Sequence, residues 1–152
     1  MPANKTENNP AGSPQIYRDY NFKLILEGAS SEGHFTEVSP ICARVTNIPY
    51  REGGANQIVH QLAGPVEYEP VTLRYGITDS RMLWDWMDTA MRGVPTRRNV
   101  SIVMLKPDGS DGVRWNLNTA WPILWRGAPL DALAKEVAIE TLVLVYEELK
   151  RS

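Results

Sequence analysis

The side chains in this sequence that could do chemistry are few and scattered. The two histidines, His34 and His60, lie in different segments, and neither has a carboxylate or thiol at the spacing of HExxH or CxxC. We therefore expect surface or interface positions for both histidines. The single cysteine, Cys42, lies between Ile41 and Ala43 in a strand-like segment, which favours a buried, inert thiol over a nucleophile.

The acidic and basic clusters have plain structural explanations. Asp79 stands where a helix N-cap is expected, while Asp85 and Asp88 fall on the polar side of the same helix, where solvated carboxylates are usual. The segment "REGG" lacks the GxxxxGK[ST] frame of a phosphate loop. Arg97 and Arg98 form a basic pair too short for a nucleic-acid patch. We predict no catalytic residues, no metal site, no cofactor and no enzymatic activity.

Composition indicates one globular domain. The chain has 152 residues, of which 43% are hydrophobic and 22% are charged. A net charge of -2 gives no reason to expect an anionic membrane or sequence-specific nucleic acid as a partner. We predict a flexible tail over residues 1–16 and a single domain over 17–152. Because the tail is polar rather than apolar, we expect synthesis in the cytoplasm without a signal peptide.

Strand periodicity dominates the rest of the chain. "FKLIL", "FTEVSPICARV" and "VTLRYG" alternate as strands do, with an interruption at Pro40 in the second. "RNVSIVMLK" and "VRWNLN" flank the turn "PDGSDG" and predict a hairpin. In its second arm, Arg114, Asn116 and Asn118 alternate with apolar residues, so one face of the sheet should be dry and the other wet.

One helix is predicted in "ITDSRMLWDWMDTAMRGVP". Thr78 or Asp79 would cap it, Gly93 would end it, and its length would be about 20 Å at ~1.5 Å per residue. Trp84 and Trp86 are two positions apart, so a single narrow seam cannot bury both. We expect part of this helix to be covered by a partner, because tryptophan is enriched at protein interfaces.

The C-terminal segment is predicted to contain one long strand from about Val137 to Glu148. It carries neither proline nor inward-facing charge, as expected of a strand edge that another subunit completes. The residues assigned to this inter-subunit strand are Val137, Ile139, Leu142, Leu144 and Tyr146.

Taken in order, "YREGGANQ", "LAGPVEYEPVTLRYGITDS", "LWDWM", "RRNVSIVML", "AWPILW" and "EVAIETLVLVYEEL" resemble the tail-tube proteins of contractile phages and contractile injection systems. The resemblance covers about Tyr20 to Leu149. It implies a mainly β fold, an antiparallel sandwich or barrel with one flanking helix, in which inter-subunit strand pairing completes a hexameric ring. Such rings stack into a tube that carries cargo inside a contractile sheath. The partners implied are further copies of the chain, the sheath, and baseplate, initiator and terminator proteins.

The resemblance also suggests where the contacts lie. The family's Tyr–Arg–Glu–Gly–Gly segment, which reaches an adjacent ring, falls on Tyr50, Arg51, Glu52, Gly53 and Gly54. Candidates for the channel wall are Arg74, Arg114, Asn116 and Asn118, and the sheath side is assigned to the helix, at Trp84, Asp85 and Asp88. The sequence departs from related ones at Leu62–Gly64 and at Tyr146–Glu147, which leaves a main tube protein, a tube initiator and a minor variant all open.

Two other readings remain open from the residues. A small monomeric β-barrel binding module predicts a stable monomer with a lined pocket. A secreted hexameric ring of the type VI kind predicts isolated rings that carry effectors. A phage tail and a headless injection device are not distinguished.

Overall fold

A computed structural model describes residues 22–27, 35–54, 57–77, 79–133 and 136–152. The predicted tail, His34 and Thr78 lie outside the described residues. Within the described part there are one helix and nine strands: β1 (Phe22–Leu26), β2 (Phe35–Val38), β3 (Ala43–Arg51), β4 (Val59–Tyr68), β5 (Val71–Gly76), α1 (Met82–Met91), β6 (Arg98–Leu105), β7 (Asp111–Arg126), β8 (Ile139–Val145) and β9 (Glu148–Arg151).

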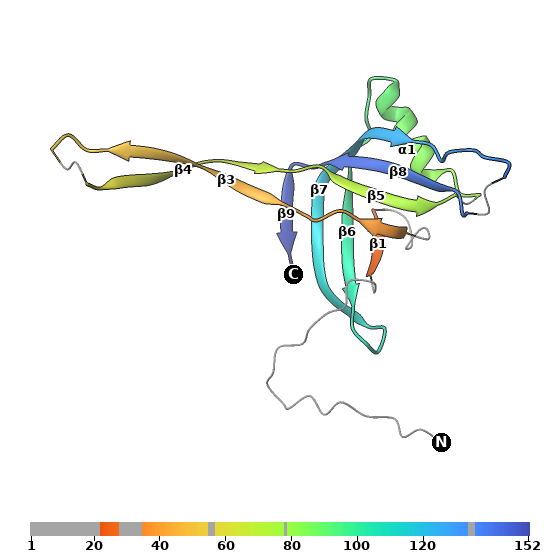
Figure 1. Ribbon diagram of the computed structural model, residues 1–152. Coiled ribbons are helices and arrows are strands. Elements are labelled where there is room, and N and C mark those ends of the chain that lie inside the picture. The colour runs from red at the N-terminus through yellow and green to blue at the C-terminus, as the bar shows by residue number, and fades with distance from the viewer. Residues whose placement is uncertain (1–21, 28–34, 55–56, 78, 134–135) are drawn as a thin grey trace, which may run out of the picture.

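Two antiparallel sheets share the long strand β7. The first part of β7 pairs with β6 on one side and β9 on the other, and β1 pairs with β6; we call these four strands sheet I. The second part of β7 pairs with β8, followed by β5 and β2, which form sheet II. The backbone turns at Thr119, which has φ 57°. The strands of the two sheets run in crossing directions (Figure 1). The prediction of a mainly β, antiparallel sandwich or barrel with a flanking helix is confirmed.

The core lies between the two sheets and follows the alternation of the sequence. Leu24 and Leu26 of β1 are 1% exposed, and Val71 and Leu73 of β5 are fully buried. In the hairpin, Leu117 of β7 is buried opposite Val100 of β6. Period-two burial of this kind is what a strand with one dry face requires. The predicted strands at β1, β5 and the β6–β7 hairpin are therefore confirmed.

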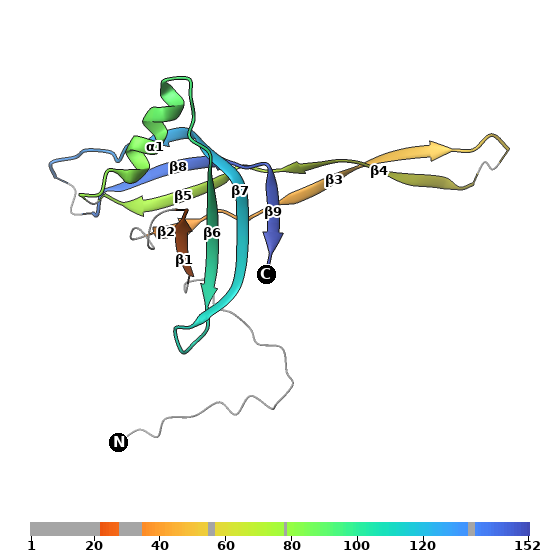
Figure 2. The ribbon, with the colours of Figure 1, turned by 180° about the vertical axis from the view of Figure 1, so that it is seen from behind.

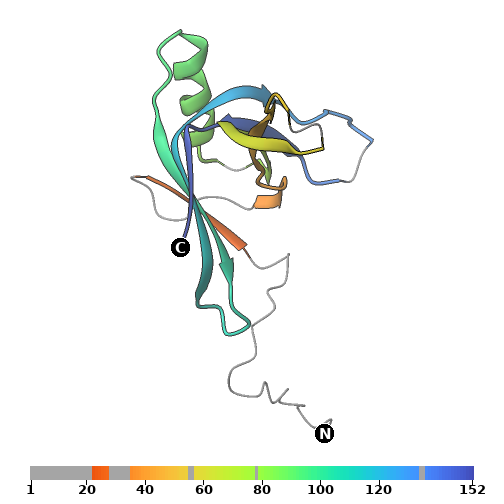
Figure 3. The same ribbon diagram turned by 90° about the vertical axis from the view of Figure 1, so that its left-hand side faces the viewer.

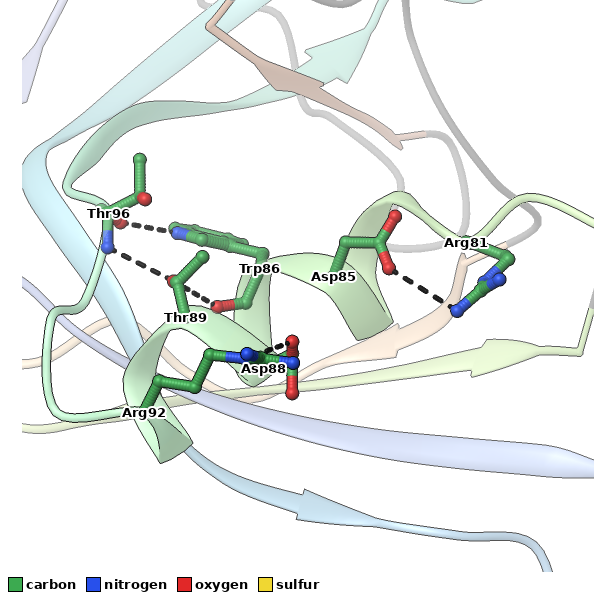
Figure 4. A network of polar contacts seen from close by, with 7 residues as sticks. All are labelled: Arg81, Asp85, Trp86, Asp88, Thr89, Arg92 and Thr96. Atoms are coloured by element: carbon green, nitrogen blue, oxygen red, sulfur yellow. Dashed lines mark hydrogen bonds and ion pairs between the residues drawn. The ribbon is translucent and has the colours of Figure 1, made fainter.

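Helix α1 packs against β7 through Trp86, which is 2% exposed and donates its indole N–H to the Thr96 carbonyl at 2.6 Å (Figure 4). Gly93 has φ 85° and ends the helix as predicted. The predicted start is wrong: the helix begins at Met82, and Arg81 occupies the N-cap position without a side-chain capping bond. It has ten residues and is therefore about 15 Å long rather than 20.

The predicted single C-terminal strand is two strands. β8 ends at Val145, the chain turns at Tyr146 and Glu147, and β9 joins the other sheet beside β7. β8 lies between β5 and β7, so both of its edges are occupied within the chain. The expectation of an unpaired edge at Ile139, Leu142 and Leu144 is therefore wrong. Leu142 and Leu144 are fully buried core residues.

Strands β3 and β4 pair only with each other and form a two-stranded ribbon that projects from the body, as Figures 1 and 2 show. We call this ribbon the arm. With nine residues in β3, it reaches about 30 Å at ~3.3 Å per residue. Sequence periodicity predicted the beginning of β3 but not the arm.

Candidate assembly surfaces

The arm exposes apolar side chains along its length. Val45 faces Val66 and Ile48 faces Leu62 across the ribbon, and these four side chains are between 48% and 53% exposed. Tyr50, which faces His60, is 52% exposed. A two-stranded ribbon is at best marginally stable alone in water. An exposed, largely apolar ribbon of this kind is typical of a segment that is covered in an assembly.

Specific contacts fix the register of the arm. Arg44 pairs with Glu67 at 3.0 Å, and the carboxylate raises the pKa of the Arg44 guanidinium. Asn47 donates to the Gln61 side-chain oxygen at 2.8 Å. At the bulge between these pairs, a Cβ placed on Gly64 would lie 2.6 Å from the Thr46 carbonyl oxygen. Only glycine fits at that point of the ribbon.

The predicted inter-ring segment lies at the end of the arm farthest from the body. Tyr50 and Arg51 end β3, and Gly54 takes φ 103° in the turn that follows. Among the described residues neither Arg51 nor Glu52 has an ion-pair partner. The structure thus places the five predicted residues together at an exposed tip, and their contact with a second ring stays a prediction.

Three of the four predicted channel residues lie on one face of sheet I. Arg114 donates to the Asn116 side-chain oxygen at 3.0 Å and to the Ser101 hydroxyl at 2.8 Å. Next to them, Asn118 donates to Glu148 at 2.9 Å, and with Lys150 it lowers the pKa of Glu148. The same face carries the Lys23–Asp111 pair, at 2.6 Å. Sheet I therefore has a mainly polar face, as the alternation of β7 predicted, with the apolar residues Ile25 and Val103 lying beneath the charged side chains on the same face.

Arg74 is separated from that face. It lies on β5 of sheet II and pairs with Glu37 of β2 at 3.2 Å. Arg114, another of the predicted channel residues, belongs to sheet I. Arg74 and Arg114 therefore do not lie on one face of one sheet.

The outer strands of sheet I are β1 and β9, and in the described part of the chain each has one unpaired edge. Arg114 and Ser152 exchange both backbone hydrogen bonds, at 3.1 and 2.9 Å. In an antiparallel ladder the next N–H along the strand points the other way, so the Arg151 N–H faces away from β7. Sequence reasoning missed this edge because it assigned the unpaired edge to the apolar run of β8.

The helix residues assigned to the sheath side lie on α1. Trp84 is 36% exposed and packs edge-to-face on Trp125 at 4.8 Å, whereas Trp86 is in the core. This contrast confirms that the two tryptophans do not share one seam. Asp85 forms an ion pair with Arg81, and Asp88 forms one with Arg92, each between residues four positions apart (Figure 4).

A second exposed apolar surface lies in the loop between β7 and β8. Leu130 and Leu133 are 92% and 90% exposed, and Val137, assigned above to an inter-subunit strand, is 76% exposed and precedes β8. Periodicity gave no signal for this surface because the described residues there, 127–133 and 136–138, belong to neither a strand nor a helix.

The described residues contain no group of three or more His, Cys, Asp or Glu that could hold a metal ion. Cys42 is a half-buried free thiol and His60 lies exposed on the arm. No helix in the described part is long and apolar enough to cross a membrane.

A sandwich with a projecting ribbon and unpaired strand edges defines a subunit built for assembly. The sequence matches the T4-like virus tail tube protein gp19 family over residues 18–150, so the chain belongs to that family. The resemblance seen in the sequence is confirmed, and the chain is a tail tube protein of the kind found in phage tails and tail-like particles. Comparison with curated protein sequences gives no match.

Solved structures agree with this assignment. A chain in the anti-feeding prophage baseplate is similar at 25% identity over 92% of this chain and 96% of that one, with a TM-score of 0.76. A chain in the PVC sheath–tube complex in the extended state shares the fold at 20% identity over 90% and 91%, with a TM-score of 0.79. Hcp1 from Flavobacterium johnsoniae has a lower TM-score of 0.58, at 13% identity over 87% and 94%.

Proposed function

We propose that this chain is the inner-tube protomer of a contractile particle, and that hexameric rings of it stack into a hollow tube. The observation that supports this most directly is sheet I, which in the described part of the chain has four strands, a polar face and an unpaired edge on each side. Pairing β9 of one subunit with β1 of the next would join the sheets into a closed barrel. Closure removes both unpaired edges of sheet I, which is the usual reason for a sheet to form a ring.

In this arrangement the polar face of sheet I lines the channel. Ser101, Arg114, Asn116 and Asn118 would then face the cargo, while the apolar face packs on sheet II. A polar lining is typical of large barrels that conduct through their interior. The solved relatives include tube chains of baseplate and sheath–tube complexes, which supports a baseplate, a sheath and a terminator as partners.

Trp84 of the helix packs on Trp125, in the part of β7 that belongs to sheet II and not on the polar face of sheet I, so a sheath contact at Trp84, Asp85 and Asp88 is consistent with this arrangement. The tip of the arm, from Tyr50 to Gly54, would contact the neighbouring ring. The proposed role is structural, without catalysis, and assembly would follow synthesis in the bacterial cytoplasm, with release in a particle.

A proline at position 151 tests ring closure. Arg151→Pro removes an N–H that faces away from β7, so the subunit should keep its fold while closed rings are lost. The measurement is size-exclusion chromatography with negative-stain imaging, in the presence of a baseplate seed. As a control, Arg92→Ala removes an exposed charge from the helix and should leave ring formation unchanged.

The outcome also separates the other readings. Tubes support the proposal, isolated rings that never stack support a type VI-like carrier, and a monomer that ignores the seed supports a binding module. The type VI reading has one specific observation in its favour, the fold shared with Hcp1. The higher TM-scores of the sheath–tube and baseplate chains favour the tube.

A further inference from the structure

An apolar groove opens where sheet I extends past sheet II. Its volume is about 600 Å³. The apolar residues that line it come from both sheets and from the segment before the arm: Phe22, Phe35, Ile41, Ile102, Met104 and Trp115. Figure 3 shows the β6–β7 hairpin running beyond the strands of sheet II, so that no described strand of sheet II faces its far half.

The groove also has an unpaired backbone edge. Its wall includes β2, the last strand in the order of sheet II, which pairs with β5 on one side only among the described strands. An extended segment laid in the groove could therefore both bury apolar side chains and add its backbone to β2. This combination is the usual basis of strand addition at a sheet edge.

The arm carries the matching surface. Ile48 and Leu62 form an exposed apolar pair about halfway along the ribbon, and Tyr50 extends it toward the tip. Each strand of the arm has one free edge, since β3 and β4 pair only with each other. The arm and the groove thus expose complementary chemistry in every copy of the chain, in equal numbers.

The arm cannot enter the groove of its own subunit. Ile41 lines the groove and β3 begins two residues later, at Ala43, so the arm starts beside the groove and leads away from it. Figure 2 shows β2 and β1 on the side of the body away from the tip of the arm. Folding back would break the β3–β4 pairs over a span of about 30 Å.

We propose that the groove receives the arm of a second copy of this chain, with Ile48, Tyr50 and Leu62 seated against Ile102, Met104 and Trp115. The inference rests on the proposed tube function and names the receptor for the arm. The two surfaces differ, so the contact is head-to-tail and propagates from copy to copy. Such a contact joins subunits whose positions differ by roughly the 30 Å reach of the ribbon.

Cysteine pairs test the contact in the full chain. In a Cys42→Ser background, chains with Leu62→Cys are mixed with chains carrying Met104→Cys, assembled on a baseplate seed, and oxidised. A disulfide requires Cα atoms within about 7 Å, so a strong cross-linked dimer of one chain of each kind is expected. The matched control replaces Leu62→Cys with Val94→Cys, an exposed apolar position beyond the helix, and should give at least about tenfold less dimer.

Tubes that form without a Leu62–Met104 cross-link above the control would overturn the proposal while leaving the tube function intact. A cross-link between Ser13→Cys and Met104→Cys within one chain, in the same tubes, would assign the groove to the chain's own N-terminal residues and overturn it as well. If the unsubstituted protein forms no rings or tubes on the seed, the tube function fails, and the inference fails with it.

A charge at the contact gives a second readout. Leu62 is half exposed, so Leu62→Asp should leave the thermal unfolding of the subunit unchanged. It should raise the concentration needed for tubes by about tenfold or more, because burial of a leucine side chain is worth at least that factor in an equilibrium constant. Val94→Asp makes the same chemical change at an exposed site outside the contact and should have no effect; equal effects of the two would contradict the proposal.

Discussion

At the scale of single residues, the alternation of apolar residues predicts which side chains are buried, but the polar residues do not predict where the helix begins. Leu24, Leu73 and Leu117 are buried where period-two alternation puts them. The helix does not begin where the sequence predicted it. Arg81 occupies the N-cap position, three residues after Thr78. Polar patterning marks a helix start only when a side chain accepts the free N–H groups, and here none does.

Gly64 gives the sharpest prediction at this scale. Gly64→Ala places a methyl group against the backbone carbonyl of Thr46, which cannot rotate away, so β3–β4 pairing should weaken by about 1–3 kcal/mol. Hydrogen exchange should speed up in the arm and leave sheets I and II unchanged. Gly53→Ala is the matched control, because nothing lies within 4 Å of its Cβ position. Similar exchange in both variants would contradict the argument.

The hydroxyl group of Tyr146 is expected to lower the free energy of unfolding. This hydroxyl is buried without a hydrogen-bond partner among the described residues, so Tyr146→Phe should raise the free energy of unfolding by about 1 kcal/mol. Burial also raises the pKa of Tyr146, so the native state keeps a proton that the unfolded state loses above about pH 10. Stability should therefore fall as the pH rises past that value, and less steeply in the variant. Denaturant titrations at pH 7 and pH 10.5 measure both effects.

At the scale of elements, the sequence predicted most of the strands that pack in the body, and it missed the arm and the separation of β9 from β8. β1, β5 and the first part of β7 show alternation because each has one dry face, whereas β6 is buried on both faces from Val100 to Val103. The arm strands contain Pro49, Gly64 and Pro65, which weigh against strands, and in a single subunit they have no core to pack on. The switch from β8 to β9 was missed because alternation continues while the chain changes sheets.

The two tryptophans of α1 differ in burial, so their substitution should cost different amounts of stability. Trp86→Ala should cost about 3–5 kcal/mol, since it empties a buried site and removes the bond to Thr96. Trp84→Ala should cost about 1–2 kcal/mol, because that ring is partly exposed and loses mainly its contact with Trp125. Guanidinium unfolding of the unassembled protein gives both values. Equal losses of stability in the two variants would show that α1 does not pack on the body mainly through Trp86.

At the scale of the whole molecule, the family and the general architecture were predictable, and the contact surfaces only in part. The segment from Tyr50 to Gly54, which the resemblance assigned to a contact with another ring, lies at the tip of the arm, and that contact stays a prediction. The inter-subunit edge was assigned to β8, whose edges are both occupied, because a linear sequence does not show which strand ends a sheet. Three of the four channel candidates share a face because they alternate along one strand, and Arg74 was added without evidence that its strand belongs to the same sheet.

Arg51 tests stacking separately from ring closure. Arg51→Glu reverses an unpaired charge at the tip of the arm, far from sheet I, so rings should still form and long tubes should become rare. Negative-stain imaging gives the distribution of tube lengths. Arg44→Glu, near the base of the arm, breaks the pair with Glu67 and provides a comparison for a charge reversal within the ribbon. Normal tube lengths in the Arg51 variant would remove the tip from the contact.

Strand β7 belongs to both sheets, and its backbone runs without a break from Asp111 to Arg126. In a tube, tension or torsion applied at the outer sheet would pass to the channel wall through covalent bonds rather than through side-chain packing alone. When a surrounding sheath shortens, sheet I and sheet II of each subunit would then move together. We expect the two layers of such a tube to resist separation, because one continuous strand joins them in each chain.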